Sequence, residues 1–375
     1  MAITFTKQLS EDILLNAYTN NIVEFSSNNI STAFKCVITV DGESYEITPN
    51  LGQFYFNFKT IFKNLITDYF EDAPDVELDS GDATTFVKDM SQVYLDVQID
   101  YAVSFVNGET ETSQRNISLL QAVSNFQDRK LREIQDTDSF AVLGKLEPLS
   151  NRLFNMVYFE GYPFDIQVYK KTPGNVTITN KTNLLDYTFN LPYKVNRIFF
   201  SDTKTDTSIQ DILPLVEGRN ELEFDTGALT TIMLEKKSGL CGVYLKWKNH
   251  FGGWSYWLFN ERAQTERDIK DLGYINNDYQ NLDNNNFIKN IGKVSQDTMQ
   301  IGAINVEPRY REFILSLFDS PKVYLFMGAE FSKDGESDWL SVKLNTDSII
   351  VTPFKDRPMD INCEIELPLR NTLTL

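Results

Sequence analysis

Apolar and polar residues alternate along much of the chain with the two-residue period of a β-strand. The clearest case is Val93 to Val103, where every second residue is apolar and the intervening positions include Asp96 and Asp100. A period of two places the apolar side chains on one face of a sheet and the acids on the other. Similar alternation from Cys36 to Val40 and from Ile361 to Leu367 predicts strands near both ends of the chain.

Turn residues connect these strands as hairpins. Asp41-Gly42 and Asn107-Gly108 each follow an alternating run, and both pairs tolerate the positive φ of a two-residue hairpin turn. Such short connections join antiparallel neighbours. The sequence therefore predicts a mostly β protein with several antiparallel β-sandwich or barrel-like domains and a few short packing helices.

The helices are expected in two segments that have a helical period. From Lys59 to Phe70 and from Arg309 to Phe318, apolar residues recur three or four positions apart. Pro308 and Pro321 flank the second segment, as is typical of helix ends. Neither apolar stripe is long enough for a coiled coil or a membrane anchor, so we expect both helices to pack onto a sheet.

The segment from Gly242 to Phe259 is a predicted hairpin rich in tryptophan. Its first strand alternates, a turn follows at Gly252-Gly253, and its second strand is apolar on both faces. Such a strand is covered on both sides, either by two layers of its own chain or by a partner chain. In the second case the candidate interface residues are Trp247, Phe251, Trp254, Tyr256 and Trp257.

Length and two polar stretches set the expected domain organisation. A chain of 375 residues has room for two or three domains. Polar residues dominate Gln127 to Ser139 and Asn260 to Lys293. We expect an N-terminal β-sandwich-like domain over 1–136, a middle β domain with the Trp-rich hairpin over 137–262, and a C-terminal α+β domain over 263–375.

The chain is strongly acidic, with a formal net charge of −18. A surface with this charge repels nucleic acid and anionic lipid. No apolar run approaches the roughly 20 residues that span a bilayer. The start, Met1 to Lys7, lacks the basic and apolar regions of a secretory signal. We therefore expect no membrane partner and no specific binding of nucleic acid.

Residues that usually carry catalysis or bind metals are few. The odd number and wide spacing of the three cysteines, Cys36, Cys241 and Cys363, argue against a disulfide framework, and we expect each to be a buried small hydrophobe. The single histidine, His250, lies in the predicted hairpin loop and cannot form a multi-histidine metal site. We therefore expect no cofactor and no metal.

Two Asp-Ser/Thr-Gly triplets are the main catalytic alternative. They begin at Asp79 and Asp225, and aspartic proteases use two such aspartates to share one proton and activate water. However, the first triplet lies in an acidic loop, Glu71 to Asp82, and Asp-x-Gly is also common turn sequence. The same loop is a hypothetical calcium site, although its spacing differs from the helix–loop–helix calcium pattern.

Three segments carry a resemblance to a known group of proteins. They are the hairpin Tyr-Leu-Lys-Trp-x-Asn-x-x-Gly-Gly-Trp-x-Tyr-Trp-Leu-Phe within Val243 to Phe259, the stretch from Val40 to Phe58, and the ending from Pro321 to Leu375. Together they resemble virion proteins of tailed phages that infect Bacteroidetes, including crAss-like podoviruses. The resemblance implies a non-enzymatic structural subunit, assembled into the virion in the host bacterial cytoplasm. Such a subunit would form part of a ring in the tail, or in the neck or hub that joins head and tail.

The resemblance also implies partners. They are copies of the same chain in a ring and other tail, neck or portal proteins of the virion. An acidic lumen would let DNA pass without specific binding, because like charges repel. The alternative is a carbohydrate- or receptor-binding tail β-sandwich, in which exposed Trp247, Trp254, Tyr256 and Trp257 stack on sugar rings.

Overall fold

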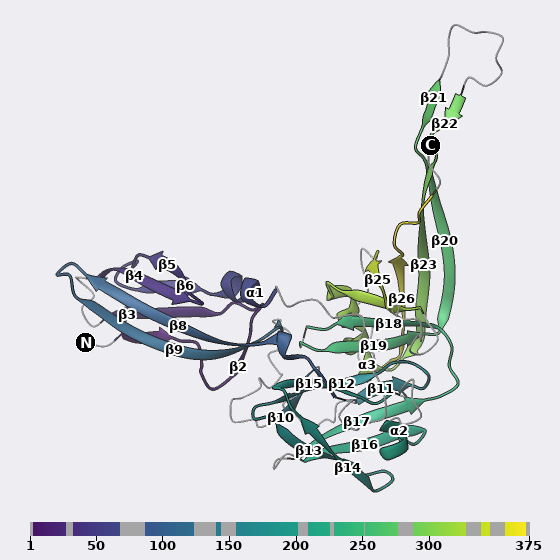
Figure 1. Ribbon diagram of the computed structural model, residues 1–375, viewed down its shortest axis with the longest axis horizontal. Coiled ribbons are helices and arrows are strands. Elements are labelled where there is room, and N and C mark those ends of the chain that lie inside the picture. Colours follow the sequence, from purple (N-terminus) through teal and green to yellow (C-terminus); the bar gives the residue numbers. More distant parts are fainter. Residues whose placement is uncertain are drawn as a thin grey trace. The chain divides into compact units, whose positions relative to one another are not determined.

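The computed structural model is built mainly of β-strands, and its helices are short (Figure 1). It describes residues 3–27, 33–67, 87–123, 140–143, 155–201, 209–225, 229–250, 252–276, 288–327, 339–345 and 357–372. Its strands form several antiparallel sheets, with a parallel pairing of β2 and β9. The predicted fold class is confirmed. The chain divides into two compact units, the first comprising residues 1–236 and 249–254 and the second residues 237–248 and 255–375.

The first unit begins with a β-sandwich whose two sheets enclose one hydrophobic core. A three-stranded sheet, in the order β1-β3-β6, shares this core with a five-stranded sheet in the order β2-β9-β8-β4-β5. The elements are β1 Ile3–Lys7, β2 Leu14–Asn16, β3 Ile22–Ser27, β4 Ala33–Val40, β5 Glu43–Ile47, β6 Phe54–Asn57, α1 Lys59–Thr67, β8 Tyr94–Phe105 and β9 Thr110–Leu120. The helix predicted from Lys59 and the strand predicted from Val93 are both present.

Aromatic rings fill the core between these sheets. Phe25 of β3 stacks on Phe54 of β6, with ring centroids 5.1 Å apart, and meets the ring of Tyr101 of β8 edge-on at 5.4 Å. Phe58, just before α1, stacks on Phe62 within the helix at 5.1 Å. All five rings are buried. The sheets and the helix are therefore held together mainly by burial of apolar area.

One predicted turn is confirmed and the other is longer than expected. Asp41-Gly42 forms a two-residue turn between β4 and β5, with φ of 49° and 81°. The prediction of a two-residue turn at Asn107-Gly108 is wrong, because β8 ends at Phe105 and β9 begins at Thr110. The N–H of Phe105 donates to the carbonyl of Glu109, which closes a wider loop around the predicted turn.

Two further sheets complete the first unit. One has the order β10-β12-β15-β7 and the other the order β11-β17-β16-β13-β14. Phe140 of β10 stacks on Phe224 of β16 with ring centroids 5.4 Å apart, so the two sheets pack face to face. The elements are β7 Val87–Asp89, the 3₁₀ turn Ser91–Val93, β10 Phe140–Val142, β11 Asn155–Phe159, β12 Asp165–Lys170, β13 Gly174–Asn180, β14 Leu185–Leu191, β15 Val195–Phe199, α2 Ile209–Ile212, β16 Gly218–Asp225 and β17 Leu229–Lys237.

The second unit is a seven-stranded sheet with a helix packed on it. The strand order is β19-β18-β24-β25-β26-β23-β20, and β21 and β22 form a separate pair. Phe313 of α3 contacts Trp247 of β18, with ring centroids 5.6 Å apart. The elements are β18 Val243–Lys248, β19 Trp254–Phe259, β20 Glu261–Asp271, β21 Tyr274–Asn276, β22 Ile288–Asn290, β23 Lys293–Val306, α3 Pro308–Leu315, the 3₁₀ turn Ser316–Asp319, β24 Val323–Phe326, β25 Trp339–Leu344 and β26 Met359–Glu366.

Two expectations about domain organisation need correction. The Trp-rich hairpin, expected in the middle domain, belongs to the C-terminal sheet because β18 pairs with β24, with Leu245 opposite Leu325. The stretch from Asn260 to Lys293, expected to be a boundary, contains β20, β21 and β22. The other expected boundary, Gln127 to Ser139, lies outside the described residues, and the three-domain division as a whole stays a prediction.

The aromatic core of the first sandwich gives a stability test. Phe25→Ala removes a buried ring that contacts both sheets, so we expect the free energy of unfolding to fall by about 3–5 kcal/mol. Urea unfolding followed by far-UV circular dichroism measures this change. The matched control is Phe34→Ala, because Phe34 on β4 is 46% exposed and its removal should cost far less. Equal losses for the two variants would contradict the role assigned to this core.

Candidate interaction surface

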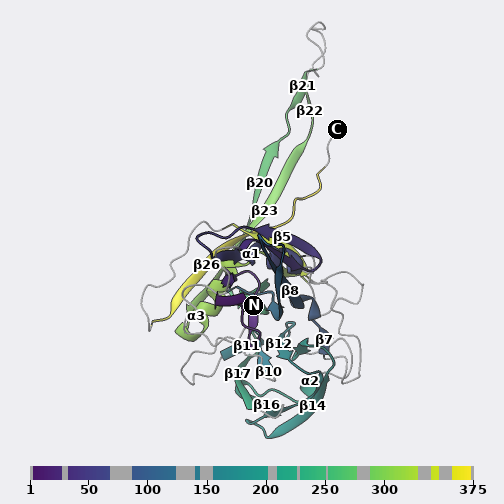
Figure 2. The same ribbon diagram turned by 90° about the vertical axis from the view of Figure 1, so that its left-hand side faces the viewer.

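The paired strands β20 and β23 form a long ribbon in the second unit. The two strands are antiparallel, with Arg267 opposite Asp297. Figures 1 and 2 show the ribbon extending beyond the other strands of its sheet, with β21 and β22 at its far end. We call residues 261–276 and 288–297 the arm.

The β20 strand has no apolar alternation because neither of its faces covers a core. Residues 263–272 are all exposed. Charged residues of both signs occupy much of the strand, among them Glu266, Arg267, Asp268 and Lys270. Charges on an exposed edge strand discourage indiscriminate pairing with other strands. The missing apolar signal explains why the sequence pattern marked this stretch as a boundary.

A cluster of two arginines around Asp297 ties the arm to the C-terminal segment. Arg267 donates from Nε and Nη2 to the two carboxylate oxygens of Asp297, at 2.6 and 3.1 Å. Arg370 donates from Nη1 to Oδ2 at 3.0 Å. The hydrogen bond from Arg267 contributes most to lowering the pKa of Asp297, and the bond from Arg370 adds to it against an opposing effect of burial.

The C-terminal segment covers one edge of the arm. The N–H of Leu367 donates to the carbonyl of Asp297 at 2.9 Å, and the N–H of Arg370 donates to the carbonyl of Ser295 at 3.3 Å. Thr372 adds a hydroxyl bond to the carbonyl of Lys293. The opposite edge, along β20, is the end of the sheet, and no strand in the described part of the chain pairs with it.

Apolar side chains are exposed towards the far end of the arm. The exposed fractions are 57% for Ile269, 45% for Leu272, 67% for Tyr274 and 46% for Ile275. Apolar side chains gathered on an exposed element are typical of a surface that binds another molecule. The arm therefore combines an open strand edge with an exposed apolar end.

The interface residues predicted in the Trp-rich hairpin lie inside the chain. Trp247, Trp254, Tyr256 and Trp257 are all buried. The indole Nε1 of Trp247 donates to Oγ of Ser316 at 2.9 Å, and the Trp257 ring lies 5.5 Å from the ring of Tyr310. Phe251, the remaining candidate, lies outside the described residues. The chain thus covers these four side chains by itself and leaves them no open face for a sugar ring.

The candidate acids are only partly described. Asp225 is the last residue of β16 and is exposed. Asp79 and the acidic loop from Glu71 to Asp82 lie outside the described residues, so the protease and calcium hypotheses stay predictions.

Within the described ranges, no group of three or more His, Cys, Asp or Glu side chains could hold a metal ion. In those same ranges no helix combines the length and the apolar character needed to cross a bilayer.

The cysteines divide into two buried residues and one exposed residue. Cys36 and Cys363 are buried as predicted, and burial raises the pKa of each thiol to about 12. A thiol with so high a pKa stays protonated and unreactive near neutral pH. The prediction for Cys241 is wrong, because it is exposed in the connection between β17 and β18. His250 lies in the hairpin loop as expected, where its carbonyl accepts from the N–H of Val123 at 2.8 Å.

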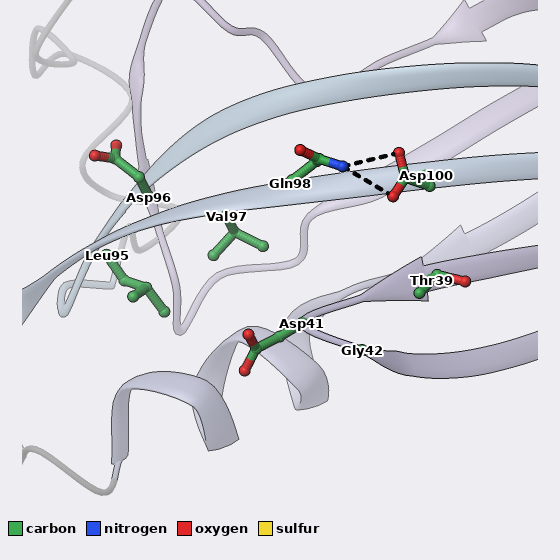
Figure 3. Close-up of a pocket in the computed structure, with 8 residues that line it drawn as sticks. All are labelled: Thr39, Asp41, Gly42, Leu95, Asp96, Val97, Gln98 and Asp100. Atoms are coloured by element: carbon green, nitrogen blue, oxygen red, sulfur yellow. Dashed lines mark hydrogen bonds between the residues drawn. The ribbon is translucent and has the colours of Figure 1, made fainter.

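A shallow hollow of about 330 Å³ lies on the first sandwich, between β8 and the turn from β4 to β5 (Figure 3). Its acidic lining residues are Asp41, Asp96 and Asp100. Both carboxylate oxygens of Asp100 accept from Nε2 of Gln98, at 3.2 and 3.0 Å. The Asp96 carboxylate accepts from Lys194, so two of the three acids already bind other side chains of the chain.

A polar network in the first unit connects the Asp96 carboxylate of β8 to Lys194. Lys194 Nζ donates to Asp96 Oδ2 at 2.7 Å and to the Tyr94 hydroxyl at 2.9 Å, and Ser118 donates to Asp96 Oδ1 at 2.7 Å. Burial opposes ionisation of Asp96, but the bonds from Lys194, Tyr94 and Ser118 outweigh it and lower the pKa of the carboxyl. Burial and then the bond to Asp96 raise the pKa of Tyr94.

Comparison with known proteins gives no family for this chain. No family matches the sequence, and no curated protein matches it. The fibronectin(III)-like modules of Clostridium thermocellum CbhA are 9% identical over 63% of this chain and 95% of theirs, with a TM-score of 0.19. Bacteroides ovatus SGBP-B, solved with a mixed-linkage heptasaccharide, is 6% identical over 98% of this chain and 65% of its own, with a TM-score of 0.17. Likenesses this weak carry no functional argument.

The Asp297 cluster predicts how the C-terminal segment is held. Asp297→Ala removes the carboxylate that binds Arg370, so the amides of Leu367 and Arg370 should exchange hydrogen faster, because local opening becomes easier. Hydrogen exchange read by mass spectrometry measures this. Asp271→Ala is the matched control, since the Asp271 bridge to Lys293 spans 3.6 Å between exposed groups and should matter little. Unchanged exchange in Asp297→Ala would refute the assignment.

The Asp96 network predicts a pH dependence of stability. A lowered folded-state pKa means that Asp96 stabilises the fold above its ordinary pKa of about 3.9, and that this contribution is lost as the pH falls through the folded pKa. Asp96→Asn should therefore unfold more easily at pH 7, and its difference from the wild type should vanish in acid. Urea unfolding across pH tests this, with Asp100→Asn as the control that leaves Lys194 paired. A difference that does not shrink as the pH falls below the ordinary pKa of about 3.9 would contradict the prediction.

Proposed function

We propose that this chain is a non-enzymatic structural subunit of a phage virion, forming part of a ring in the tail or in the neck or hub that joins head and tail. The observation that carries the proposal is the arm. Its residues 263–272 are all exposed, and its far end exposes apolar side chains. A contact with a neighbouring subunit accounts for an element of this kind.

The sheets of both units support a scaffolding role. Each unit has a core of aromatic and aliphatic side chains. In the second unit this core includes the buried hairpin residues Trp247 and Tyr256. Packed cores of this type give a rigid body, which a subunit in a fixed position requires. The choice of a phage virion as the assembly rests on the sequence resemblance to phage virion proteins. That resemblance lies in Val40 to Phe58, Val243 to Phe259 and Pro321 to Leu375.

The net charge of −18 supports the passage of DNA through such a ring. An acidic lining repels the phosphate backbone, so DNA would move past without specific binding. The carbohydrate-binding alternative depended on exposed aromatic residues of the Trp-rich hairpin. Because the four described candidates are buried, no specific observation favours that alternative.

The arm gives a direct test of the proposed function. Asp271 lies opposite Lys293, so replacing residues 272–292 by Asn-Gly joins two paired positions with a two-residue turn and should leave the rest of the fold intact. The full chain should form a closed oligomer or bind other virion proteins in light-scattering and copurification measurements. The shortened chain keeps residues 267–271 and should keep its unfolding midpoint, but it should no longer form the closed oligomer or bind other virion proteins.

A control and a contrary result complete this test. Leu184→Ser removes a similarly exposed apolar side chain from the first unit and should leave assembly unchanged. A full-length chain that stays a monomer and binds no virion protein would overturn the proposal. So would a shortened chain that assembles as well as the full-length chain.

A further inference from the structure

The open edge of β20 carries a self-complementary charge pattern. Residues 267–271 are Arg-Asp-Ile-Lys-Asp, so their charges run positive, negative, neutral, positive, negative. Reversing the direction of the segment gives negative, positive, neutral, negative, positive. Every charge therefore meets its opposite when the segment lies antiparallel to a second copy of itself, centred on Ile269. All five side chains are exposed.

The backbone of β20 is oriented for this pairing. The carbonyls of Ser295 and Asp297 in β23 accept hydrogen bonds from the C-terminal segment, so they face away from β20. The direction of hydrogen bonding alternates along an antiparallel strand. The residues next to them in β23, Gln296 and Val294, therefore bond to β20. These two residues lie opposite Asp268 and Lys270.

The remaining backbone groups of β20 face outward by the same alternation. They are the N–H and C=O groups of Arg267, Ile269 and Asp271. No strand among the described residues bonds to them, because β20 is the last strand of its sheet. An open row of donors and acceptors is a template for another strand.

We propose that two copies of this chain join by antiparallel pairing of β20 about a two-fold axis that passes through the pair of Ile269 residues. Arg267 of each copy lies opposite Asp271 of the second copy, and Asp268 lies opposite Lys270. Four pairs of opposite charge then flank the two isoleucines. Directly opposed residues of opposite charge stabilise antiparallel strands, and the central contact covers an exposed apolar side chain.

The pairing extends the ion pairs that already exist within each ribbon. In the chain itself Arg267 lies opposite Asp297, and Asp271 lies opposite Lys293. In the proposed four-stranded sheet, one row of directly opposed residues crosses all four strands. It consists of Asp297 and Arg267 of one copy, followed by Asp271 and Lys293 of the second copy. The charges alternate along the whole row, so no like charges become neighbours.

Neighbouring registers of the same pairing are unfavourable. A shift of one position places Arg267 opposite Lys270 in one direction and Asp268 opposite Asp271 in the other. A shift of two positions places Asp268 or Lys270 opposite itself. Like charges directly opposite each other destabilise a strand pair, so the charges select one register and argue for a second copy as the occupant of this edge.

This contact names one specific partner of the arm. It rests on the proposed function in one respect, which is that the arm is an element through which subunits assemble. Ring interfaces are head-to-tail, whereas a two-fold contact joins copies in pairs through identical surfaces. The pairing therefore adds one partner to those expected for a ring subunit.

A charge-reversal series tests the proposed register. Asp268 and Lys270 lie opposite the uncharged Gln296 and Val294 within their own chain, so changing them breaks no ion pair across the ribbon. Asp268→Lys alone, or Lys270→Asp alone, places like charges opposite each other at two symmetric positions. Either variant should raise the dimer dissociation constant roughly tenfold or more. The double variant restores opposite charges and should return the constant to near the wild-type value.

Sedimentation equilibrium of the full chain at low ionic strength, over a range of concentrations, measures these constants. Circular dichroism should show the same folded spectrum for all four proteins. A double variant that dimerises as weakly as the single variants would overturn the proposed register. A wild-type chain that stays monomeric at every concentration would overturn the pairing itself.

Disulfide trapping tests the same geometry independently of charge. In a Cys241→Ser background, Ile269→Cys places two thiols opposite each other across the axis. Hydrogen-bonded antiparallel residues have Cα atoms about 5.5 Å apart, within reach of a disulfide. Mild oxidation should yield a covalent dimer. Thr265→Cys, also exposed on β20 but away from the axis, should not cross-link, and equal cross-linking of the two variants would overturn the register.

The outcomes separate this contact from the proposed function. A chain that forms no β20 dimer but still binds virion proteins would overturn the pairing and leave the structural role standing. A β20 dimer that binds no virion component and forms no larger assembly would support the pairing and count against the virion role.

Discussion

Backbone hydrogen bonding at the edges of sheets is the constraint on which the rest of this structure depends. A strand in the middle of a sheet bonds on both sides, whereas an end strand leaves one row of N–H and C=O groups open. In the second unit, the C-terminal segment bonds to Ser295 and Asp297 and so closes one edge of the arm. The β20 edge stays open among the described residues, and alternating charges occupy it. The arm is therefore protected against indiscriminate pairing but retains the capacity to bind a strand of matching charge.

The distribution of aromatic side chains separates the scaffold from the surface. Phe25 and Tyr101 hold the first sandwich together, and Trp247 holds a helix on the C-terminal sheet. Their burial stabilises each unit through apolar area removed from water. Tyr274 and Ile275, near the end of the arm, are exposed instead. The tryptophans of the hairpin are buried, whereas Tyr274 and Ile275 are exposed on the arm, and this contrast favours assembly over recognition of a sugar by exposed tryptophans.

Ion pairs play different roles in the two units. In the first unit, Arg197 donates to Asp165 from Nε at 2.9 Å, and both side chains are buried, so breaking the pair would leave an uncompensated charge in the interior. In the arm, the Asp297 carboxylate is buried, whereas its partners Arg267 and Arg370 are each about half exposed, and these pairs act mainly by holding the C-terminal segment in register. Surface pairs contribute little free energy individually, but their signs decide which strands can lie side by side. An acidic chain thus uses a locally balanced segment where it is expected to meet another copy.

The sequence by itself determined the local features. The alternation in β8 and β26, the Asp41-Gly42 turn, the helix that starts at Pro308 and the buried Cys36 follow from residues that are neighbours along the chain, because side-chain period and turn chemistry are local properties. It did not determine which part of the chain covers β19, the strand that is apolar on both faces. Nor did it determine the pairing of β18 with β24 or the presence of the arm within Asn260 to Lys293. Periodicity reports only that a face is covered, and residues 263–272 of β20 are exposed on both faces, so β20 gave no signal. Only the tertiary structure decided these points, because strand pairing joins segments far apart in the sequence, such as Leu245 and Leu325, and the C-terminal segment reveals which edge of the ribbon stays open.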